Sequence, residues 1–268
     1  MLSIVAKGYS LEWNEKGQPD ACDLPNGPNC EPHHEFVSES IATVLKMGAM
    51  RTRLRHQAKC IMPLDVAIRK INGKLRLIFD ARWINQHMPE LKIKFETLHR
   101  EGRAIFDGCT CGWIVDLSFA YHHIQIPEED WQYLCFRWDG QLYCFCVLPF
   151  GITTAPLVFT TVLKPIIGHW RRTMGMQVLP FMDDLTGGDP SPPRAAAQSK
   201  YAVWHLQHLG WVIQPKKCLG VGAPLEMVHS LGIDVDFTCQ QYRSSATCIK
   251  QIIDCLLYTS PSPRDGLL

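Results

Sequence analysis

The stretch Phe181-Met182-Asp183-Asp184 ends an apolar run, Gln177-Val178-Leu179-Pro180, and leads into Leu185-Thr186-Gly187-Gly188. The apolar run predicts a hydrophobic strand, so the two adjacent carboxylates would lie at its tip. Such a pair favours the binding of a cation. Asp-Asp also occurs in exposed turns, so the tetrapeptide by itself leaves a solvated turn open as an alternative.

A third carboxylate, Asp116, closes a second apolar run, Gly112-Trp113-Ile114-Val115. Two Mg²⁺ ions in a phosphoryl-transfer site lie roughly 3.5–4 Å apart and are held by oxygen ligands. Carboxylates at two strand ends would supply such oxygen ligands. We therefore expect Asp116, Asp183 and Asp184 to converge on two Mg²⁺ ions, with Mn²⁺ as an alternative ion, and the pattern indicates a nucleotidyl-transfer centre.

The composition is typical of a globular protein. Of the 268 residues, 46% are hydrophobic and 20% are charged, which fits one large domain or two closely packed ones. No run approaches the roughly 18 apolar residues of a membrane span, and the first residues lack a secretory core segment. We expect an intracellular protein, cytoplasmic or nuclear, that does not bind membranes.

The twelve cysteines are scattered through apolar stretches, which favours reduced and mostly buried thiols. Cys109-x-Cys111 and Cys144-x-Cys146 each have one intervening residue, which in a strand places both side chains on one face. The two-residue spacing of a structural zinc site is absent from both pairs, so the sequence disfavours zinc.

The net charge of +1 hides a strong polarity along the chain. From Lys46 to Arg103 there are 14 Lys and Arg against 5 Asp and Glu, a local +9, which leaves 13 against 21, or −8, elsewhere. A basic block ahead of an acidic region suits a protein that holds polyanions near bound metal. A solvated lysine-rich surface is the alternative, but interleaved apolar residues favour an ordered basic sheet.

Two hairpins are predicted from turn residues between apolar strands. The first covers 66–79 with Ile71-Asn72-Gly73 at its turn, and the second covers 133–147 with Asp139-Gly140 at its turn.

Three helices are predicted over 36–45, 155–170 and 191–209, the last two with a proline near the first turn. Residues 1–35 contain four prolines and little periodicity, which predicts a loose lead-in. Hairpins interspersed with helices indicate an α+β fold with an antiparallel sheet.

The ordered series of segments between Phe36 and Asp236 resembles a reverse transcriptase. The segments that carry the resemblance are Lys74-Leu75-Arg76-Leu77-Ile78-Phe79-Asp80-Ala81-Arg82, Asp116-Leu117-Ser118-Phe119-Ala120-Tyr121, Leu148-Pro149-Phe150-Gly151 with Ala155-Pro156, Phe181-Met182-Asp183-Asp184, Leu209-Gly210-Trp211-Val212-Ile213-Gln214-Pro215-Lys216-Lys217 and Leu231-Gly232-Ile233-Asp234. The resemblance implies a right-hand polymerase fold, with fingers and a palm built on an antiparallel sheet.

Finer details resemble the polymerase of DIRS-type retrotransposons, which are mobilised by a tyrosine recombinase. They are Phe36-Val37-Ser38-Glu39-Ser40-Ile41, Tyr121-His122-His123 and Gly168-His169-Trp170-Arg171.

The resemblance implies roles for the acids. Asp116 and Asp183 would bridge the two Mg²⁺ ions, one activating the primer 3′-hydroxyl and the other holding the triphosphate, while Asp184 would shape the site. Lys217 would be the general acid for the leaving pyrophosphate, with Lys216 as the alternative. Many relatives carry Tyr where Phe181 stands, a departure that affects primer positioning rather than metal binding.

Basic residues on the first hairpin would contact the nucleotide triphosphate. Arg76 and Lys70 are the candidates, with Arg69 as the alternative to Lys70 because the register could slip by one residue. An exposed cationic hairpin without a ligand is the other interpretation.

Bulky and small residues would complete the nucleotide site. Tyr121 stands five residues after Asp116, where the family places a side chain against the sugar 2′ position, so it would exclude ribonucleotides; a core tyrosine is the alternative. Phe150 and Gly151 would form a turn that lets the backbone approach nucleotide or template closely.

We expect three regions: a lead-in over 1–35, fingers and palm over 36–240, and the start of a truncated thumb over 241–268. From about residue 256 the chain resembles a translation of sequencing-adapter read-through, and a native Pro/Ser-rich linker is the alternative. The chain is therefore expected to be a fragment.

The leading hypothesis is an RNA-directed DNA polymerase of a retrotransposon, a nucleotidyltransferase that uses an RNA or DNA template, a DNA primer and dNTPs. A catalytically silent or domesticated nucleic-acid-binding module derived from such an enzyme is the alternative. A generic Mg²⁺ nuclease is disfavoured by the basic hairpin and the turn at Phe150 and Gly151.

Overall fold

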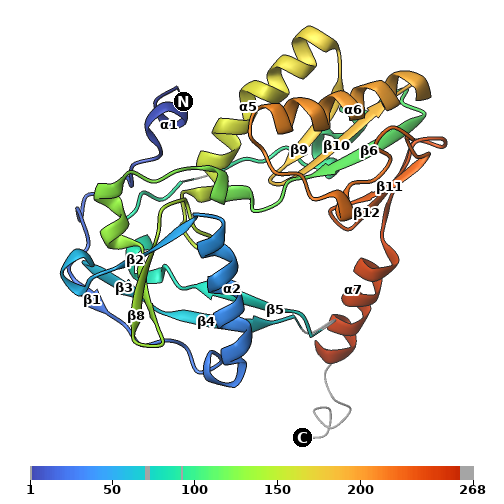
Figure 1. The fold of residues 1–268 in the computed structure, drawn as a ribbon. Coiled ribbons are helices and arrows are strands. Elements are labelled where there is room, and N and C mark those ends of the chain that lie inside the picture. The colour runs from blue at the N-terminus through green and yellow to red at the C-terminus, as the bar shows by residue number, and fades with distance from the viewer. Residues whose placement is uncertain (1, 70–72, 92, 260–268) are drawn as a thin grey trace, which may run out of the picture. The chain divides into compact units, whose positions relative to one another are not determined.

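The computed structural model of the chain describes residues 2–69, 73–91 and 93–259 (Figure 1). The chain forms two compact units, each assembled from two separate stretches of sequence. Unit 1 comprises Met1–Lys94 and Phe119–Pro165, and unit 2 comprises Phe95–Ser118 and Ile166–Leu268. Among the described residues, no helix combines the length and apolar character needed to cross a lipid bilayer.

Unit 1 is built on a mixed five-stranded sheet. The strand order is β1 (Cys22–Asp23), β3 (Cys60–Met62), β7 (Cys135–Trp138), β8 (Gln141–Phe145) and β2 (Met50–Arg53). The first three strands run parallel, and β7, β8 and β2 pair antiparallel. The β7–β8 turn uses Asp139 and Gly140, both with positive φ, as the Asp-Gly pair predicts.

A two-stranded antiparallel hairpin, β4 (Leu64–Ile68) and β5 (Leu75–Phe79), forms a second sheet in unit 1. It confirms the first predicted hairpin. Residues 70–72 of its turn lie outside the described residues.

Helices complete unit 1. They are α1 (Leu2–Lys7), α2 (His34–Lys46), α3 (Arg82–Asn85) and the 3₁₀ turns Glu31–His33, Arg55–Gln57, Ala120–His123 and Glu128–Tyr133. The predicted helix over 36–45 is confirmed by α2, which begins two residues earlier and ends one residue later.

Residues 1–35 differ from the loose lead-in that their prolines predict. Strand β1 extends the five-stranded sheet beside β3, and the side chains of Tyr9, Leu11 and Cys30 are buried. The backbone N–H of Leu11 donates to Asp130 Oδ2 at 2.8 Å. Pairing with distant parts of unit 1 therefore orders a segment that has no periodicity of its own.

Unit 2 contains a three-stranded antiparallel sheet in the order β6 (Cys111–Asp116), β10 (Asp184–Asp189) and β9 (Gln177–Phe181). Helix α6 (Pro192–His208) packs against β6 and β10 (Figure 1). Helix α5 (Ala155–Met174) begins in unit 1 and continues in unit 2, with Pro165 inside it. Both predicted helices are confirmed, and α5 runs four residues further than predicted.

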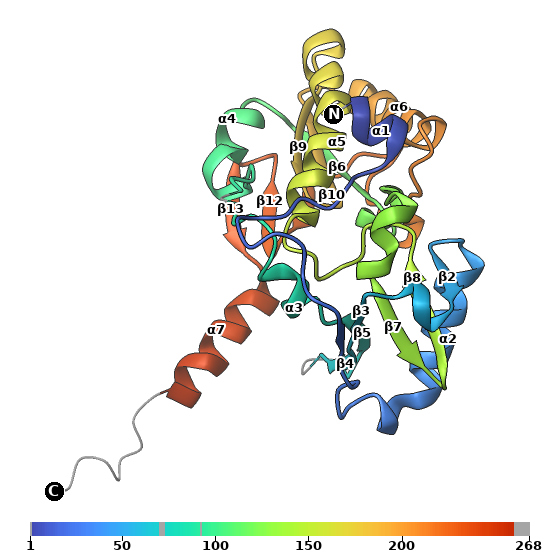
Figure 2. The same ribbon diagram turned by 90° about the vertical axis from the view of Figure 1, so that its left-hand side faces the viewer.

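A second antiparallel sheet in unit 2 consists of β11 (Met227–Ser230), β12 (Ile233–Asp236) and β13 (Gln241–Ser244), followed by α7 (Ala246–Thr259). A π-helical turn (Leu98–Gly102), α4 (Arg103–Ile105) and the 3₁₀ turn Pro215–Lys217 complete the unit. Figure 2 shows α4 beside β12 and β13. A shared core joins the two sheets; its members include Phe106, Ile114, Leu179, Val228, Val235 and Phe237.

Candidate active site

The acids at the two predicted strand ends meet in unit 2. Asp184, the first residue of β10, is the Cα partner of Asp116, the last residue of β6. On the other side of β10, Asp184 is paired with Phe181, so only Met182 and Asp183 form the turn. Met182 has a φ of 55°, a left-handed backbone conformation that residues other than glycine adopt rarely. This tight turn places Asp183 beside the Asp116–Asp184 pair.

Backbone hydrogen bonds hold the acidic turns in place. The N–H of Leu117 donates to the carbonyl oxygen of Asp183 at 2.9 Å, which joins the end of β6 to the β9–β10 turn. The N–H of Gln214 donates to the carbonyl oxygen of Asp116 at 2.8 Å, which ties the segment before Pro215–Lys217 to the same strand end. Asp116 is only 3% exposed, so its carboxylate is enclosed by the surrounding residues.

Lys217 forms an ion pair with Asp116. Its Nζ lies 2.9 Å from Oδ2 and 3.1 Å from Oδ1 of the carboxylate. The hydrogen bond to Asp116 raises the pKa of Lys217, and the charges of Asp116, Asp183 and Asp184 act in the same direction. Of the two lysines that the sequence left open, Lys217 is therefore the one that this contact brings to the acids.

The carboxyl group of Asp184 is held in an unfavourable environment for its charge. Burial raises the pKa of Asp184 to about 7, and a hydrogen bond with Asp116 and the nearby charges of Asp183 and Asp116 add to the effect. Lys217 opposes it only in part. Crowded carboxylates of this kind share protons unless a cation neutralises them.

Glycines on β10 and β6 allow large rings to lie directly against the backbone of this sheet. A Cβ at Gly187 of β10 would come within 2.1 Å of the buried indole ring of Trp113 on β6, and a Cβ at Gly112 would come within 2.2 Å of Phe237. Packing thus requires glycine at position 187, since a glycine inside a strand permits close approach.

Unit 1 contains the residues predicted to surround the nucleotide. Tyr121 packs against Phe150 with ring centroids 4.7 Å apart and against Phe159 at 5.7 Å. Tyr121 is buried, whereas Phe150 is 51% exposed. The contact with Phe150 brings two of the predicted nucleotide-binding residues together.

Gly151 is fitted against the end of the first hairpin. Its φ is 104°, and a Cβ at this position would lie 2.6 Å from the carbonyl oxygen of Phe79, the last residue of β5. The side chain of Asn85 fixes the turn, because its Nδ2 donates to the Gly151 carbonyl at 2.7 Å and its Oδ1 accepts from the Thr153 N–H at 3.0 Å. Only glycine fits this site without displacing the backbone.

Arg76 projects from β5 on the exposed face of the hairpin. Its Cα partner is Ala67, and its side chain is exposed. Lys70 lies outside the described residues. The neighbouring Arg69 is in place near the turn, where its N–H donates to the Lys74 carbonyl at 2.9 Å.

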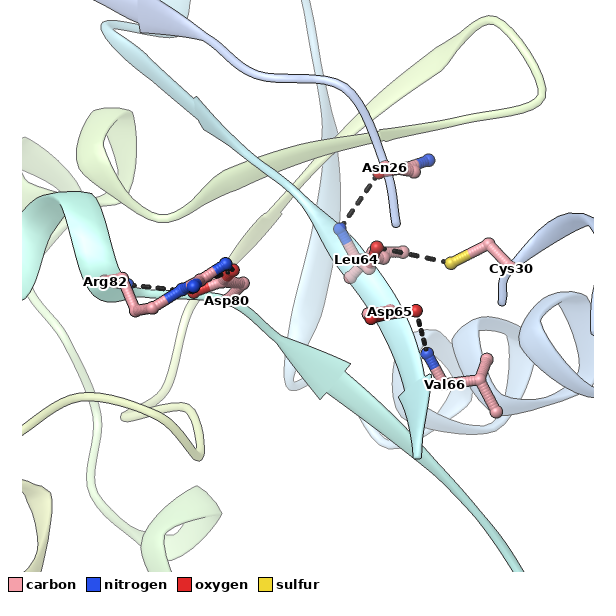
Figure 3. Close-up of polar contacts among 7 residues, drawn as sticks. All are labelled: Asn26, Cys30, Leu64, Asp65, Val66, Asp80 and Arg82. Atoms are coloured by element: carbon pink, nitrogen blue, oxygen red, sulfur yellow. Dashed lines mark hydrogen bonds and ion pairs between the residues drawn. The ribbon is translucent and has the colours of Figure 1, made fainter. Parts of the chain in front are cut away.

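The base of the hairpin is fixed by polar contacts (Figure 3). Arg82 pairs with Asp80, with Nη2 2.6 Å from Oδ2, and this pair lowers the pKa of Asp80. On the other strand, the Leu64 N–H donates to Asn26 Oδ1 at 2.9 Å. These contacts fix the end of the hairpin at which Leu64 pairs with Phe79, opposite its turn.

Sequence reasoning missed two residues that support the predicted ones. Cys218 accepts a hydrogen bond from the Asp116 N–H, with N and Sγ 3.5 Å apart, and Asn85 holds Gly151 across 66 positions of sequence. Both act on the backbone of a distant segment. A residue of this kind gives no local pattern by which it could be found.

Comparison with known proteins places these features in a family. Residues 68–235 match the family described as reverse transcriptase (RNA-dependent DNA polymerase). The Tf2-3 and Tf2-7 transposon polyproteins of Schizosaccharomyces pombe are 27% and 26% identical to the chain over 213 residues, or 79% of its length. The chain spans about 15% of the length of these curated relatives.

Solved structures show a similar fold. A foamy viral protease-reverse transcriptase in complex with an RNA/DNA hybrid aligns with a TM-score of 0.73 at 16% identity, over 94% of this chain and 32% of the other. The same kind of protein in complex with double-stranded DNA gives 0.70 at 17% identity, over 96% and 50%. The predicted α+β fold of polymerase fingers and palm is confirmed. With the family match covering most of the chain, it follows that the chain belongs to the reverse transcriptase family.

Proposed function

We propose that the chain carries the fingers and palm of a retrotransposon's RNA-directed DNA polymerase, which transfers a nucleotide from a dNTP to a primer 3′-hydroxyl. The pairing of Asp116 with Asp184 across β6 and β10, with Asp183 in the adjoining turn, carries this proposal. Residues 36–240 would supply the fingers and palm, and residues 241 onward the beginning of a thumb. Part of that last region, 260–268, lies outside the described residues.

The donor set fits Mg²⁺ by its chemistry. Asp116, Asp183 and Asp184 offer only oxygen ligands, which Mg²⁺ prefers, and Mn²⁺ accepts the same donors. The raised pKa of Asp184 reflects carboxylates crowded together in a buried position, a repulsion that a divalent cation would relieve. As the described side chains stand, no three His, Cys, Asp or Glu residues converge closely enough to hold an ion.

The chain's own residues would position the reactants. When bound, two Mg²⁺ ions would lower the pKa of the primer hydroxyl and neutralise the phosphates. Asp116 and Asp183 would hold both ions, and Asp184 would shape the site. Lys217 is protonated near neutral pH like any lysine, its ion pair with Asp116 raises its pKa further, and it would donate its proton to the pyrophosphate as that ion pair opens.

Unit 1 would supply the nucleotide contacts. Arg76 would meet the triphosphate from its exposed position on β5, together with Lys70 or its neighbour Arg69. Tyr121 would lie against the sugar 2′ position, and its packing against the exposed ring of Phe150 would hold it there. Gly151 lets the backbone of its turn come close to a ligand because it lacks a Cβ.

Primer extension tests the proposal. The whole chain is incubated with a DNA primer on an RNA template, dNTPs and Mg²⁺, and we expect Asp183→Asn to reduce extension by several orders of magnitude, since the loss of one anionic metal ligand removes several kcal/mol of transition-state stabilisation. Asp234→Asn, which changes a partly exposed acid of the same unit, is the matched control. Circular dichroism and thermal unfolding check that both variants fold.

The outcomes separate the two candidate functions. Extension by the wild type and by Asp234→Asn, but not by Asp183→Asn, supports the polymerase. Wild-type protein that binds an RNA/DNA duplex yet extends no primer on RNA or DNA templates would instead indicate a silent or domesticated nucleic-acid-binding module.

We also propose that the element is of the DIRS type and that the protein acts inside the cell, in the cytoplasm or nucleus. Support for the type comes from the resemblance of Tyr121-His122-His123 and Gly168-His169-Trp170-Arg171 to that group. Sequencing the locus tests it. A tyrosine recombinase frame beside this one would support the placement, and an integrase frame of another class would contradict it.

A further inference from the structure

Three cysteines share one face of the five-stranded sheet in unit 1. Cys135 lies on β7, Cys144 on β8 and Cys146 just after β8. Cys135 and Cys144 are Cα partners, and Cys144 and Cys146 are two residues apart, so their side chains point to the same side. All three are buried as free thiols in one apolar cluster.

The register of β7 and β8 brings one pair of these thiols within reach of a disulfide. The Phe145 N–H donates to the Leu134 carbonyl at 3.1 Å, so the next pair, Cys135 and Cys144, occupies a non-hydrogen-bonded position of the ladder. Cα atoms at such positions are about 4.5 Å apart, within the roughly 4.4–6.8 Å that disulfides span. Cys144 and Cys146 on one extended strand are about 6.7 Å apart, at the upper limit. Although the Cys144 and Cys146 thiols also share a hydrogen bond, the shorter Cα separation favours a link across the strands.

Cys144 lies in an environment that stabilises its thiolate. The Nε–H of Arg53 donates to its Sγ at 3.4 Å. Arg53 is held there by Glu128, with Nη2 3.0 Å from Oε1, and by the ring of Trp131, 4.8 Å from its guanidinium carbon. Arg51 is the Cα partner of Cys144 on β2.

These contacts change the acidity of the thiols. The hydrogen bond that Cys144 and Cys146 share lowers the pKa of Cys144 to about 7 and raises that of Cys146, and Arg53 lowers the pKa of Cys144 further against the effect of burial. Burial raises the pKa of Cys135 to about 12. One thiol of the pair is thus prepared to act as nucleophile and the other stays protonated near neutral pH.

We propose that Cys144 is a peroxide-reactive thiol whose disulfide partner is Cys135, so that this face of the sheet is a site of reversible oxidation. The thiolate sulfur of Cys144 attacks one oxygen of a hydroperoxide; the O–O bond breaks, and the departing alkoxide takes a proton from water. The thiol of Cys135 then attacks the resulting sulfenic acid, an S–S bond forms and water leaves. Two thiols are oxidised by two electrons, the peroxide is reduced to an alcohol and water, and a dithiol reverses the change.

The same sheet contains an internal comparison. Cys22 and Cys60 are Cα partners on the parallel strands β1 and β3, so they too are neighbours across strands. Burial raises the pKa of Cys22 and raises that of Cys60 to about 12. Cys22 and Cys60 are thus paired across strands as Cys135 and Cys144 are, but neither has a lowered pKa.

Peptide mapping of the oxidised chain tests the proposal. The reduced whole chain is treated with hydrogen peroxide at pH 7, alkylated at set times and digested with trypsin, which cuts after Arg137 and separates Cys135 from Cys144; tandem mass spectrometry then locates the linked cysteine in each peptide, because these peptides also contain Cys109, Cys111 and Cys146. We expect linked peptides from Cys135 and Cys144 at a rate roughly tenfold or more above those from Cys22 and Cys60, because only the former pair has a substantial thiolate fraction. Dithiothreitol should reverse the link.

Variants and pH identify the reactive thiol. Cys144→Ser should abolish the fast link and Arg53→Gln should slow it, while Cys30→Ser, which removes a buried thiol elsewhere in unit 1, should leave it unchanged. For the wild type, which needs no variant to fold, the rate should rise with pH around a midpoint near 7. A link that forms no faster than Cys22–Cys60, a rate unaffected by Arg53→Gln, or a disulfide between Cys144 and Cys146 alone would overturn the proposal.

Discussion

Replacing Gly187 by Ala should destabilise unit 2 strongly, and the structure gives the reason atom by atom. The new Cβ would lie 2.1 Å from Cζ2 and 2.2 Å from Cε2 of Trp113, far inside ordinary contact distance. Trp113 is fully buried, so its ring cannot swing into solvent. Overpacking of a core costs about 1–3 kcal/mol, and we expect about 3 kcal/mol here because the ring must move by more than 1 Å.

A neighbouring glycine gives a graded control. At Gly188 the added Cβ would lie 3.0 Å from Phe106 and Phe237, a contact that small shifts can relieve. We expect Gly188→Ala to cost about 1 kcal/mol, clearly less than Gly187→Ala. Urea unfolding of both variants, followed by circular dichroism, measures the difference in free energy of unfolding.

A double-mutant cycle with Trp113→Phe tests the mechanism. The shorter ring removes the atoms that Gly187→Ala would strike, and it also removes an indole N–H that finds no hydrogen-bond partner among the described residues. The two changes should therefore couple by 1 kcal/mol or more, in the direction of rescue. Additivity within about 0.5 kcal/mol, or a Gly187→Ala variant as stable as Gly188→Ala, would refute the reasoning.

Three further predictions concern the site itself. The pKa of Asp184 is raised to about 7 in the folded state, so the metal-free protein should lose stability as the pH rises from about 4 to 7. Asp184→Asn should flatten this pH dependence and raise the unfolding midpoint at pH 8. A variant with the same pH profile of stability as the wild type would contradict this assignment. Gly151→Ala should cost about 1–3 kcal/mol of stability and raise KM for dNTP, because the new Cβ would lie 2.6 Å from the Phe79 carbonyl oxygen at a φ of 104°. A variant with wild-type unfolding and kinetics would show that the turn has room for a Cβ. Tyr121→Val should lower the kcat/KM ratio of dNTP over rNTP by removing the ring, whereas an unchanged ratio with surviving dNTP activity would assign Tyr121 to the core.

Elements with local signals could be predicted from the sequence. The second hairpin follows from Asp139-Gly140, whose φ values of 47° and 74° suit a two-residue turn. Helix α6 follows from Ser191 and the prolines after it, as Pro192 occupies its first turn. The end of α5 was predicted at residue 170, yet the helix continues to Met174, because periodicity alone does not mark where packing stops.

Elements that depend on distant partners could not be predicted. Strand β1 exists because Cys22 lies beside Cys60, and Leu11 is ordered by Asp130 more than one hundred positions away. In the site, acids at the ends of two apolar strands indicated that Asp116 and the Asp183-Asp184 pair converge, but the pairing of β6 with β10, which are far apart in sequence, had no local signal. The register that places Lys217 rather than Lys216 on Asp116 depends on a 3₁₀ turn that no local pattern revealed.

The division of each unit into two stretches of sequence has a consequence during synthesis. Strand β6 ends at Asp116, but its partner β10 begins only at Asp184, so the ribosome must add 67 intervening residues before the central ladder of unit 2 can form. For that interval β6 presents an unpaired edge that is apolar except for Asp116, the kind of surface that promotes association between nascent chains. Timely release of β10 from the exit tunnel, or shielding of β6 by a chaperone, would therefore govern how much of the newly made chain reaches its native state.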